Sequence, residues 1–176
     1  GPDLDLYIDC NGIFNTVGNA VRAGKAVEEY NITFFEEPVP HENLEAMAYV
    51  RRKINIPVAT GERLFAIFSF QKLLACGGAD IVQPDMSHCG GMLEARKIAA
   101  IADAQYVAFA PHNRNGEVSY ASAVQMAACI PNFLTLEHFP PEPWRFDVCS
   151  NPLVVEDGWL EVPDRPGLGV EFNEEA

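Results

Sequence analysis

Six acidic or basic residues recur along the chain at nearly constant intervals of 23 to 27 residues. Each lies at or just after the end of a short apolar run. They are Asp9, Glu36, Glu62, Asp85, His112 and Glu137. An interval of this length suits one β-strand plus one crossover helix. Because the carboxyl ends of parallel barrel strands face one mouth, the phase predicts that these side chains converge.

Asp9, Glu36 and Glu62 are carboxylates from three successive predicted strand ends. Carboxylate oxygens are the ligands that Mg²⁺ prefers, and Mg²⁺ leaves positions open for water and substrate. Without a cation, three carboxylates at one site would repel one another, and at least one would be driven towards protonation. The pattern therefore predicts a Mg²⁺ site, although each acid alone could equally be a helix cap or an ion-pair partner.

Asp85 and His112 suggest a different role. A carboxylate that accepts a hydrogen bond from one imidazole nitrogen fixes the tautomer and makes the other nitrogen more basic. We expect this pair to supply a general base one strand beyond the metal ligands. Glu137, on the last predicted strand, could hydrogen-bond a developing anion if its pKa is raised.

Two neighbouring residues are candidates for binding a substrate. Arg63, directly after Glu62, could hold a carboxylate with two hydrogen bonds, or could equally form a surface salt bridge. Asn11, two residues after Asp9, could point into the same mouth, because alternate residues of a strand share a face. A cation beside a base indicates one reaction class: abstraction of the proton α to a carboxylate, with the cation stabilising the enediolate.

Hydrophobic periodicity predicts the elements that position these residues. We expect strands over 4–9, 32–35, 56–59, 80–83, 106–110 and 133–136, alternating with helices over 16–30, 42–53, 68–76, 92–104 and 118–129. Six parallel strands do not close a barrel of the standard eight. The chain is therefore expected to be the carboxyl-terminal part of a longer barrel enzyme. An open doubly wound sheet is the alternative, but no glycine-rich phosphate-binding fingerprint follows the first strand.

The pattern breaks after the sixth predicted strand. Residues 1–139 are expected to form the partial barrel, and the Pro- and Gly-rich residues 140–176 a tail that packs on the scaffold.

Composition narrows the class of function. A net charge of −13 argues against binding nucleic acid, which requires clustered Lys and Arg. The five cysteines show no C-x-x-C pair, which favours reduced thiols in a cytoplasmic protein. No apolar run reaches membrane-spanning length, and no signal peptide is evident, so we expect no membrane partner.

Taken together, these motifs resemble the enolase superfamily and, within it, the mandelate racemase and muconate lactonizing enzyme subgroup. The matching segments are Ile8-Asp9-Cys10-Asn11-Gly12, Phe35-Glu36-Glu37-Pro38, Ala59-Thr60-Gly61-Glu62-Arg63, Gln83-Pro84-Asp85, Ala110-Pro111-His112-Asn113 and Pro166-Gly167-Leu168-Gly169. The likeness covers essentially the whole chain.

The resemblance implies a (β/α)₇β barrel capped by an α+β domain, with this chain beginning at the third strand. It implies that the Mg²⁺ ligands are Asp9, Glu36 and Glu62, that Asp85 and His112 form the dyad, and that Glu137 faces the enediolate. The cap, and a Lys-x-Lys pair from the second strand, would lie outside the chain. The chain alone is expected to be inactive, and a homo-oligomer is expected by family likeness.

Residues 61–64 and 83–91 are most similar to acid-sugar dehydratases of the galactonate type, which implies a small sugar-acid substrate. Such enzymes often carry His two residues after the first ligand, as the acid that expels hydroxide; here that residue is Asn11. His112 would then serve as both base and acid, or the reaction differs. A racemase, epimerase or cycloisomerase on the same scaffold is one alternative, and an inactive truncated half-barrel is another.

Overall fold

Five parallel strands form one sheet with sequential order β1-β2-β3-β4-β5. The computed structural model describes residues 4–139 and 147–175. The strands are short: β1 (Tyr7–Asp9), β2 (Phe34–Glu36), β3 (Val58–Thr60), β4 (Ile81–Val82) and β5 (Ala108–Phe109). The parallel α/β fold expected from the sequence is confirmed.

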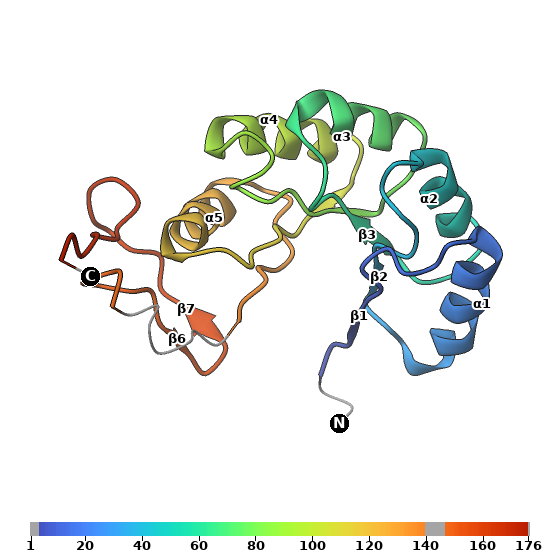
Figure 1. The fold of residues 1–176 in the computed structure, drawn as a ribbon, viewed down its shortest axis with the longest axis horizontal. Helices are drawn as coiled ribbons and strands as arrows, with labels where there is room; N and C mark the ends of the chain where they lie inside the picture. The colour runs from blue at the N-terminus through green and yellow to red at the C-terminus, as the bar shows by residue number, and fades with distance from the viewer. Residues whose placement is uncertain (1–3, 140–146, 176) are drawn as a thin grey trace.

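Each pair of successive strands is joined by a helix, and a fifth helix follows β5. The helices are α1 (Val17–Val27), α2 (Leu44–Arg51), α3 (Ala66–Ala75), α4 (Met92–Asp103) and α5 (Glu117–Cys129), with a 3-10 turn η1 (Glu28–Tyr30) after α1. Figure 1 shows α1 to α4 following one another along the outer side of the sheet. Side chains cap two of the helix starts: Thr16 accepts a hydrogen bond from the Asn19 amide, and Asn43 from the Ala46 amide.

Strands β2, β3 and β4 are buried on both faces, as expected for parallel strands covered by helices, whereas Tyr7 and Asp9 of the edge strand β1 are exposed. Their helix-facing side chains divide between two apolar clusters. Phe35 and Val58 pack with α1 and α2, whereas Val82 and Phe109 pack with α3, α4 and α5. The opposite face carries a smaller cluster whose members alternate with these along the strands: Phe34, Ala59, Ile81 and Ala110, with Ala108 beside them. This alternation fixes which strand residues face the helices and which face the barrel interior.

The sixth predicted strand, over 133–136, is present as a single parallel bridge between Phe109 and Phe133. Two backbone hydrogen bonds flank it, from Phe109 N to Asn132 O at 2.8 Å and from Leu134 N to Phe109 O at 2.9 Å. The partner strand β5 is only two residues long, and Pro111, which has no N–H, follows soon after it. The ladder therefore ends after one residue, although the segment lies where the pattern places it.

The described part of the tail contains a short antiparallel hairpin, β6 (Val155–Glu156) and β7 (Trp159–Leu160), which the sequence analysis did not predict. The tail contacts α5, where Gln125 Nε2 donates to Pro163 O at 3.3 Å. Residues 140–146, at the start of the predicted tail, lie outside the described residues, so the boundary at 139 stays a prediction. None of the helices in the described ranges is long and apolar enough to cross a membrane.

Candidate active site

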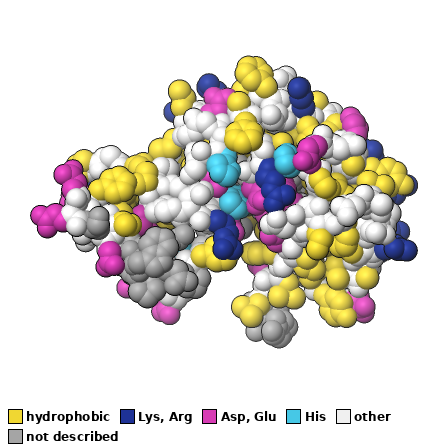
Figure 2. Space-filling view, viewed as in Figure 1, with side chains coloured by type: hydrophobic (Ala, Val, Ile, Leu, Met, Phe, Trp, Pro, Cys, Tyr) yellow, Lys and Arg dark blue, Asp and Glu magenta, His cyan; other side chains and the backbone are white. Residues whose placement is uncertain are grey.

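The predicted site residues gather at the carboxyl edge of the sheet. Asp9 and Glu36 are the last residues of β1 and β2 and are direct partners in the ladder. Glu62 lies two residues after β3. Asp85 lies three residues after β4, and His112 lies three residues after β5. In Figure 2, histidine and basic side chains meet acidic ones near the middle of the displayed face. The constant phase seen in the sequence thus corresponds to one edge of the sheet.

Asp85 and His112 form a hydrogen-bonded pair: His112 Nδ1 lies 2.7 Å from Asp85 Oδ2. Asp85 is fully buried, and its carboxylate also accepts from the Ser87 amide at 2.6 Å and from Asn115 Nδ2 at 2.7 Å. Burial by itself would raise the pKa of Asp85. The hydrogen bonds from His112 and Ser87 outweigh that effect, so the pKa lies below its usual value. Asp85 is therefore held as a carboxylate beside the imidazole.

The other nitrogen of His112 faces two more acids. Nε2 lies 3.2 Å from Glu62 Oε2 and 3.7 Å from Glu137 Oε2. Burial lowers the pKa of His112, but the hydrogen bond with Asp85 and the charges of Glu137 and Glu62 more than offset this, and the pKa is raised. With Nδ1 engaged by Asp85, Nε2 is the nitrogen available to exchange a proton with a substrate.

Glu137 reaches this group from the segment that bridges β5. Its Oε2 accepts a hydrogen bond from the Asn113 amide at 2.6 Å. Burial raises the pKa of Glu137, and the hydrogen bond from Asn113 and the charge of His112 only partly oppose the rise. A raised pKa favours the protonated form of a carboxyl group, and that form can donate a hydrogen bond.

Asp9, Glu36 and Glu62 lie at or just after the carboxyl ends of three neighbouring strands, and their role as metal ligands stays a prediction. Burial, together with the charges of Asp9, Glu137 and Glu62, raises the pKa of Glu36 to about 7 against an opposing hydrogen bond from Gln83. Among the described residues, no three His, Cys, Asp or Glu side chains lie close enough to hold a metal ion. The donor set is nevertheless all oxygen, and the charges of the neighbouring acids add to burial in raising the Glu36 pKa. Both features fit a hard divalent cation, which would offset the negative charge.

Arg63 and Asn11, the two predicted substrate-binding residues, contact each other. Arg63 Nη2 donates to Asn11 Oδ1. Arg63 Nε lies 3.2 Å from Glu62 Oε1, and Nη1 lies 3.4 Å from Oε2 of the buried Glu37. The structure therefore gives both residues internal partners at the mouth, and their predicted contact with a substrate stays a prediction.

Gly61 connects β3 to Glu62 in a conformation that only glycine adopts readily, with φ of +142°. A Cβ at this position would lie 2.8 Å from the Phe70 ring and 3.0 Å from Gln83 N. The strand end thus passes close to both α3 and β4. A glycine is what permits this approach and places Glu62 at the edge of the sheet.

Sequence reasoning missed three residues that contact this group: Asn115, Glu37 and Thr60. Asn115 lies three residues after His112 in a connecting segment, where no periodicity fixes the path of the chain. Glu37 follows a predicted ligand directly, and only the fold shows that its side chain is fully buried and accepts from Thr60 Oγ1 at 2.8 Å.

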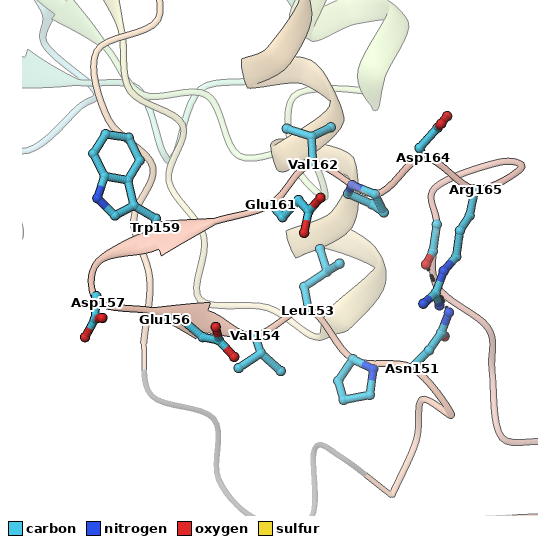
Figure 3. Close-up of a pocket in the computed structure, with 13 residues that line it drawn as sticks. Asn151, Leu153, Val154, Glu156, Asp157, Trp159, Glu161, Val162, Asp164 and Arg165 are labelled. Carbon is cyan, nitrogen blue, oxygen red and sulfur yellow. Dashed lines mark hydrogen bonds between the residues drawn. The ribbon is translucent and has the colours of Figure 1, made fainter.

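A cavity of about 770 Å³ opens elsewhere, within the tail (Figure 3). It is lined by residues of 151–169, among them Glu156, Asp157, Glu161 and Arg165. None of the eight predicted site residues lines it. The volume of this cavity therefore does not locate the candidate active site. The shared hydrogen bonds and shifted pKa values of the ionisable residues at the strand ends do.

Comparison with known proteins gives consistent results. A family model described as "Enolase C-terminal domain-like" matches residues 1–176. The chain is 35% identical to the D-xylonate dehydratase of Haloferax volcanii over 177 residues, which cover 100% of this chain and 43% of that protein. It is 38% identical to the D-galactarolactone cycloisomerase of Agrobacterium fabrum over 185 residues, covering 100% of this chain and 49% of that protein.

A solved structure shares the fold. The crystal structure of a mandelate racemase/muconate lactonizing enzyme-like protein from Roseovarius sp. TM1035 superposes with a TM-score of 0.95 at 40% sequence identity. The match covers 99% of this chain and 44% of that one. The chain thus spans about half the length of the relatives it matches, and the family resemblance expected from the motifs is confirmed.

Proposed function

We propose that this chain, which belongs to the enolase C-terminal domain-like family, carries the cation-binding and base-bearing residues of an acid-sugar dehydratase that depends on Mg²⁺. The observation that carries the proposal is the geometry of His112. One imidazole nitrogen lies 2.7 Å from the buried Asp85, and the other faces Glu62 and Glu137. A base held in this way beside a group of acids suits abstraction of a proton α to a carboxylate.

Asp9, Glu36 and Glu62 would hold the Mg²⁺. When bound, the cation supplies electrostatic stabilisation of the negative charge that develops on the substrate carboxylate. The proposal is supported by the oxygen donor set and by the charges of Asp9, Glu137 and Glu62, which add to burial in raising the pKa of Glu36.

His112 would take the α-proton on Nε2. Asp85 accepts the hydrogen bond from Nδ1, fixes the tautomer and stabilises the imidazolium that forms. As the C–H bond breaks, its electron pair enters the enediolate. Glu137, in its protonated form, would donate a hydrogen bond to an enediolate oxygen, a role that its raised pKa supports.

Dehydration then requires loss of hydroxide from the β-carbon. The electron pair of the enediolate forms the new double bond while the C–O bond breaks, and the leaving hydroxide needs a proton. Asn11 lies at the position where related dehydratases often carry His, and its amide is not an acid. We assign the proton to His112, which received it in the first step and returns it to form water. The resulting enol tautomerises to a 2-keto-3-deoxy acid.

A racemase, epimerase or cycloisomerase is the second candidate. It is favoured by Asn11, which removes the expected acid, and by the 38% identity to a D-galactarolactone cycloisomerase. Such a reaction would use the same abstraction by His112 and differ in the fate of the enediolate. A galactonate-type substrate, a homo-oligomeric state, a cytoplasmic location and inactivity of the isolated chain stay predictions.

The two candidates are separated by their products. The full-length protein that contains this chain is incubated with Mg²⁺ and a panel of aldonic and aldaric acids, and the products are followed by proton NMR. A 2-keto-3-deoxy acid identifies dehydration. A product that is an isomer of the acid supplied, with no loss of water, identifies the second candidate, and no conversion of any acid would count against both.

A further inference from the structure

Glu37 is a buried acid that lies beside the site and takes no part in the proposed reaction. Its side chain is fully buried, although Glu is among the residues rarely buried without a partner. Its φ is +38°, an unfavourable value for a residue with a side chain. Its backbone is fixed on both sides, since Glu37 N donates to Ala59 O at 3.0 Å and Gly12 N donates to Glu37 O at 2.7 Å. A strained, buried acid held this firmly at a strand end suggests a specific task.

The contacts of the carboxylate indicate what that task is. Thr60 Oγ1 donates to Oε1 at 2.8 Å, which fixes the orientation of the group. Oε2 accepts no hydrogen bond within the described part of the chain, and the nearest cation is Arg63 Nη1 at 3.4 Å. A buried charge is retained only where it is paired. The partner of Glu37 is therefore the Arg63 guanidinium.

Arg63 in turn connects the ends of two other strands. Its Nε lies 3.2 Å from Glu62 Oε1, after β3, and its Nη2 donates to Asn11 Oδ1, after β1. The planar guanidinium presents its donors in a fixed arrangement, so its position determines where both partners lie. About one third of the Arg63 side chain is exposed, whereas the Glu37 side chain that it contacts is fully buried.

We infer that Glu37 is a positioning residue: it holds Arg63, and Arg63 orients the carboxylate of Glu62 and the amide of Asn11 at the mouth of the site. The inference rests on the proposed function in one respect, namely that Glu62 is a ligand of the cation. It also gives Arg63 a role other than the predicted substrate contact. Arg63 acts on the reaction through Glu62 and Asn11, because three of its nitrogens already face protein groups.

The test uses the full-length protein and three variants. Glu37→Gln keeps the shape and removes the charge, and Arg63→Lys keeps the charge and removes the planar fork. Asp80→Asn is the matched control, because it breaks a similar ion pair, Asp80 Oδ1 to Arg51 Nη2 at 2.6 Å, at the opposite end of the sheet. For each protein, the crystal structure, the Mg²⁺ affinity by calorimetry without substrate, and the melting temperature are measured.

Glu37→Gln is expected to release Arg63 from Glu62 and Asn11 in the crystal and to weaken Mg²⁺ binding by about tenfold to a hundredfold. Arg63→Lys should weaken binding similarly, which keeps the inference testable if Glu37→Gln does not fold. Asp80→Asn should lower the melting temperature and leave Mg²⁺ affinity unchanged. An Arg63 that keeps both contacts in Glu37→Gln, or wild-type Mg²⁺ affinity in the folded variants, would overturn the inference. If the wild type binds no Mg²⁺, the proposed cation site is wrong. The crystal structures then still show whether Glu37 positions Arg63.

Discussion

Asp85 Oδ2 receives hydrogen bonds from both His112 Nδ1 and Asn115 Nδ2, each at 2.7 Å. The other oxygen of Asp85 accepts from the Ser87 amide at 2.6 Å. Three donors thus fix one buried carboxylate, which in turn fixes the imidazole. The loop after β4 supplies Asp85 and Ser87, and the loop after β5 supplies His112 and Asn115. Both loops therefore determine the orientation of the imidazole.

Asp85→Asn is expected to change the pH dependence of catalysis. Burial lowers the pKa of His112, and Asp85, Glu137 and Glu62 together raise it above its ordinary value. Since the unprotonated imidazole is the base, kcat/KM should rise with pH through the pKa of His112. Without the Asp85 charge, that pKa falls, so the rising limb should move to lower pH, and the plateau should drop by about 10² to 10⁴.

The pH profile of kcat/KM for wild type and Asp85→Asn checks this prediction. Asp80→Asn, which alters an acid at the amino end of the same strand, should leave the rising limb where it is. A limb that stays at the wild-type pH in Asp85→Asn would show that His112 does not govern it.

Asn115→Ala removes one of the three donors to Asp85. Hydrogen bonds to charged groups contribute about 1.5 to 3 kcal/mol, so kcat should fall by roughly tenfold to a hundredfold, with KM changed less. The pKa of Asp85 should rise, because one interaction that favours its ionised form is lost. Steady-state kinetics provides the measurement. If kcat is unchanged while the protein remains folded, Asn115 does not support the dyad.

Gly61→Ala should destabilise the protein by about 1 to 3 kcal/mol, because the new Cβ meets the Phe70 ring at 2.8 Å and the backbone φ is +142°. Gly18→Ala is the control: Gly18 lies in α1, and a Cβ there meets nothing within 4 Å. That substitution should cause no loss, since Ala favours helix more than Gly does. Chemical denaturation of both variants compares the two sites. Equal stabilities would contradict the close approach of β3 to α3.

Mg²⁺ should stabilise the protein more strongly at higher pH. Burial and the charges of Asp9, Glu137 and Glu62 raise the pKa of Glu36 to about 7, and a cation binds the ionised carboxylate. Protons therefore compete with Mg²⁺ below that pKa. The rise in melting temperature on adding Mg²⁺ should be larger at roughly pH 8 than at roughly pH 6. In Glu36→Gln the pH dependence should be lost; an equal rise at both pH values in the wild type would exclude Glu36 as a ligand.

The periodic part of the sequence predicted the positions of most site residues. Asp9, Glu36 and Glu62 follow apolar runs whose burial fixes the strands, so their place at one edge follows from the strand period. The role of Glu37 could not be predicted in this way. Its neighbour Glu36 is chemically identical, and only the backbone turn at φ of +38° decides which of the two carboxylates is fully buried.

The remaining differences between the predicted and the observed structure lie in turns and loops. The hairpin of the tail turns at Asp157-Gly158, both with positive φ, a pair typical of two-residue hairpin turns. The Asp-Gly pair between Val155 and Trp159 is thus a signal for a hairpin turn, although the Pro- and Gly-rich composition of the tail is typical of an irregular segment. The contact of Asn115 with Asp85 depends on a loop path that no periodic pattern specifies.

The role of His112 as the base is tested most directly by following the α-proton itself. Wild-type full-length protein and His112→Asn are incubated with Mg²⁺ and a converted acid in D₂O, and deuterium incorporation and product formation are followed by proton NMR. His138→Asn, which alters a ring packed against Tyr120, is the control. We expect the rate of α-proton abstraction to fall by about 10²- to 10⁴-fold in His112→Asn, while Mg²⁺ still stabilises the variant. Exchange or turnover by His112→Asn at the wild-type rate would contradict the assignment of His112 as the base.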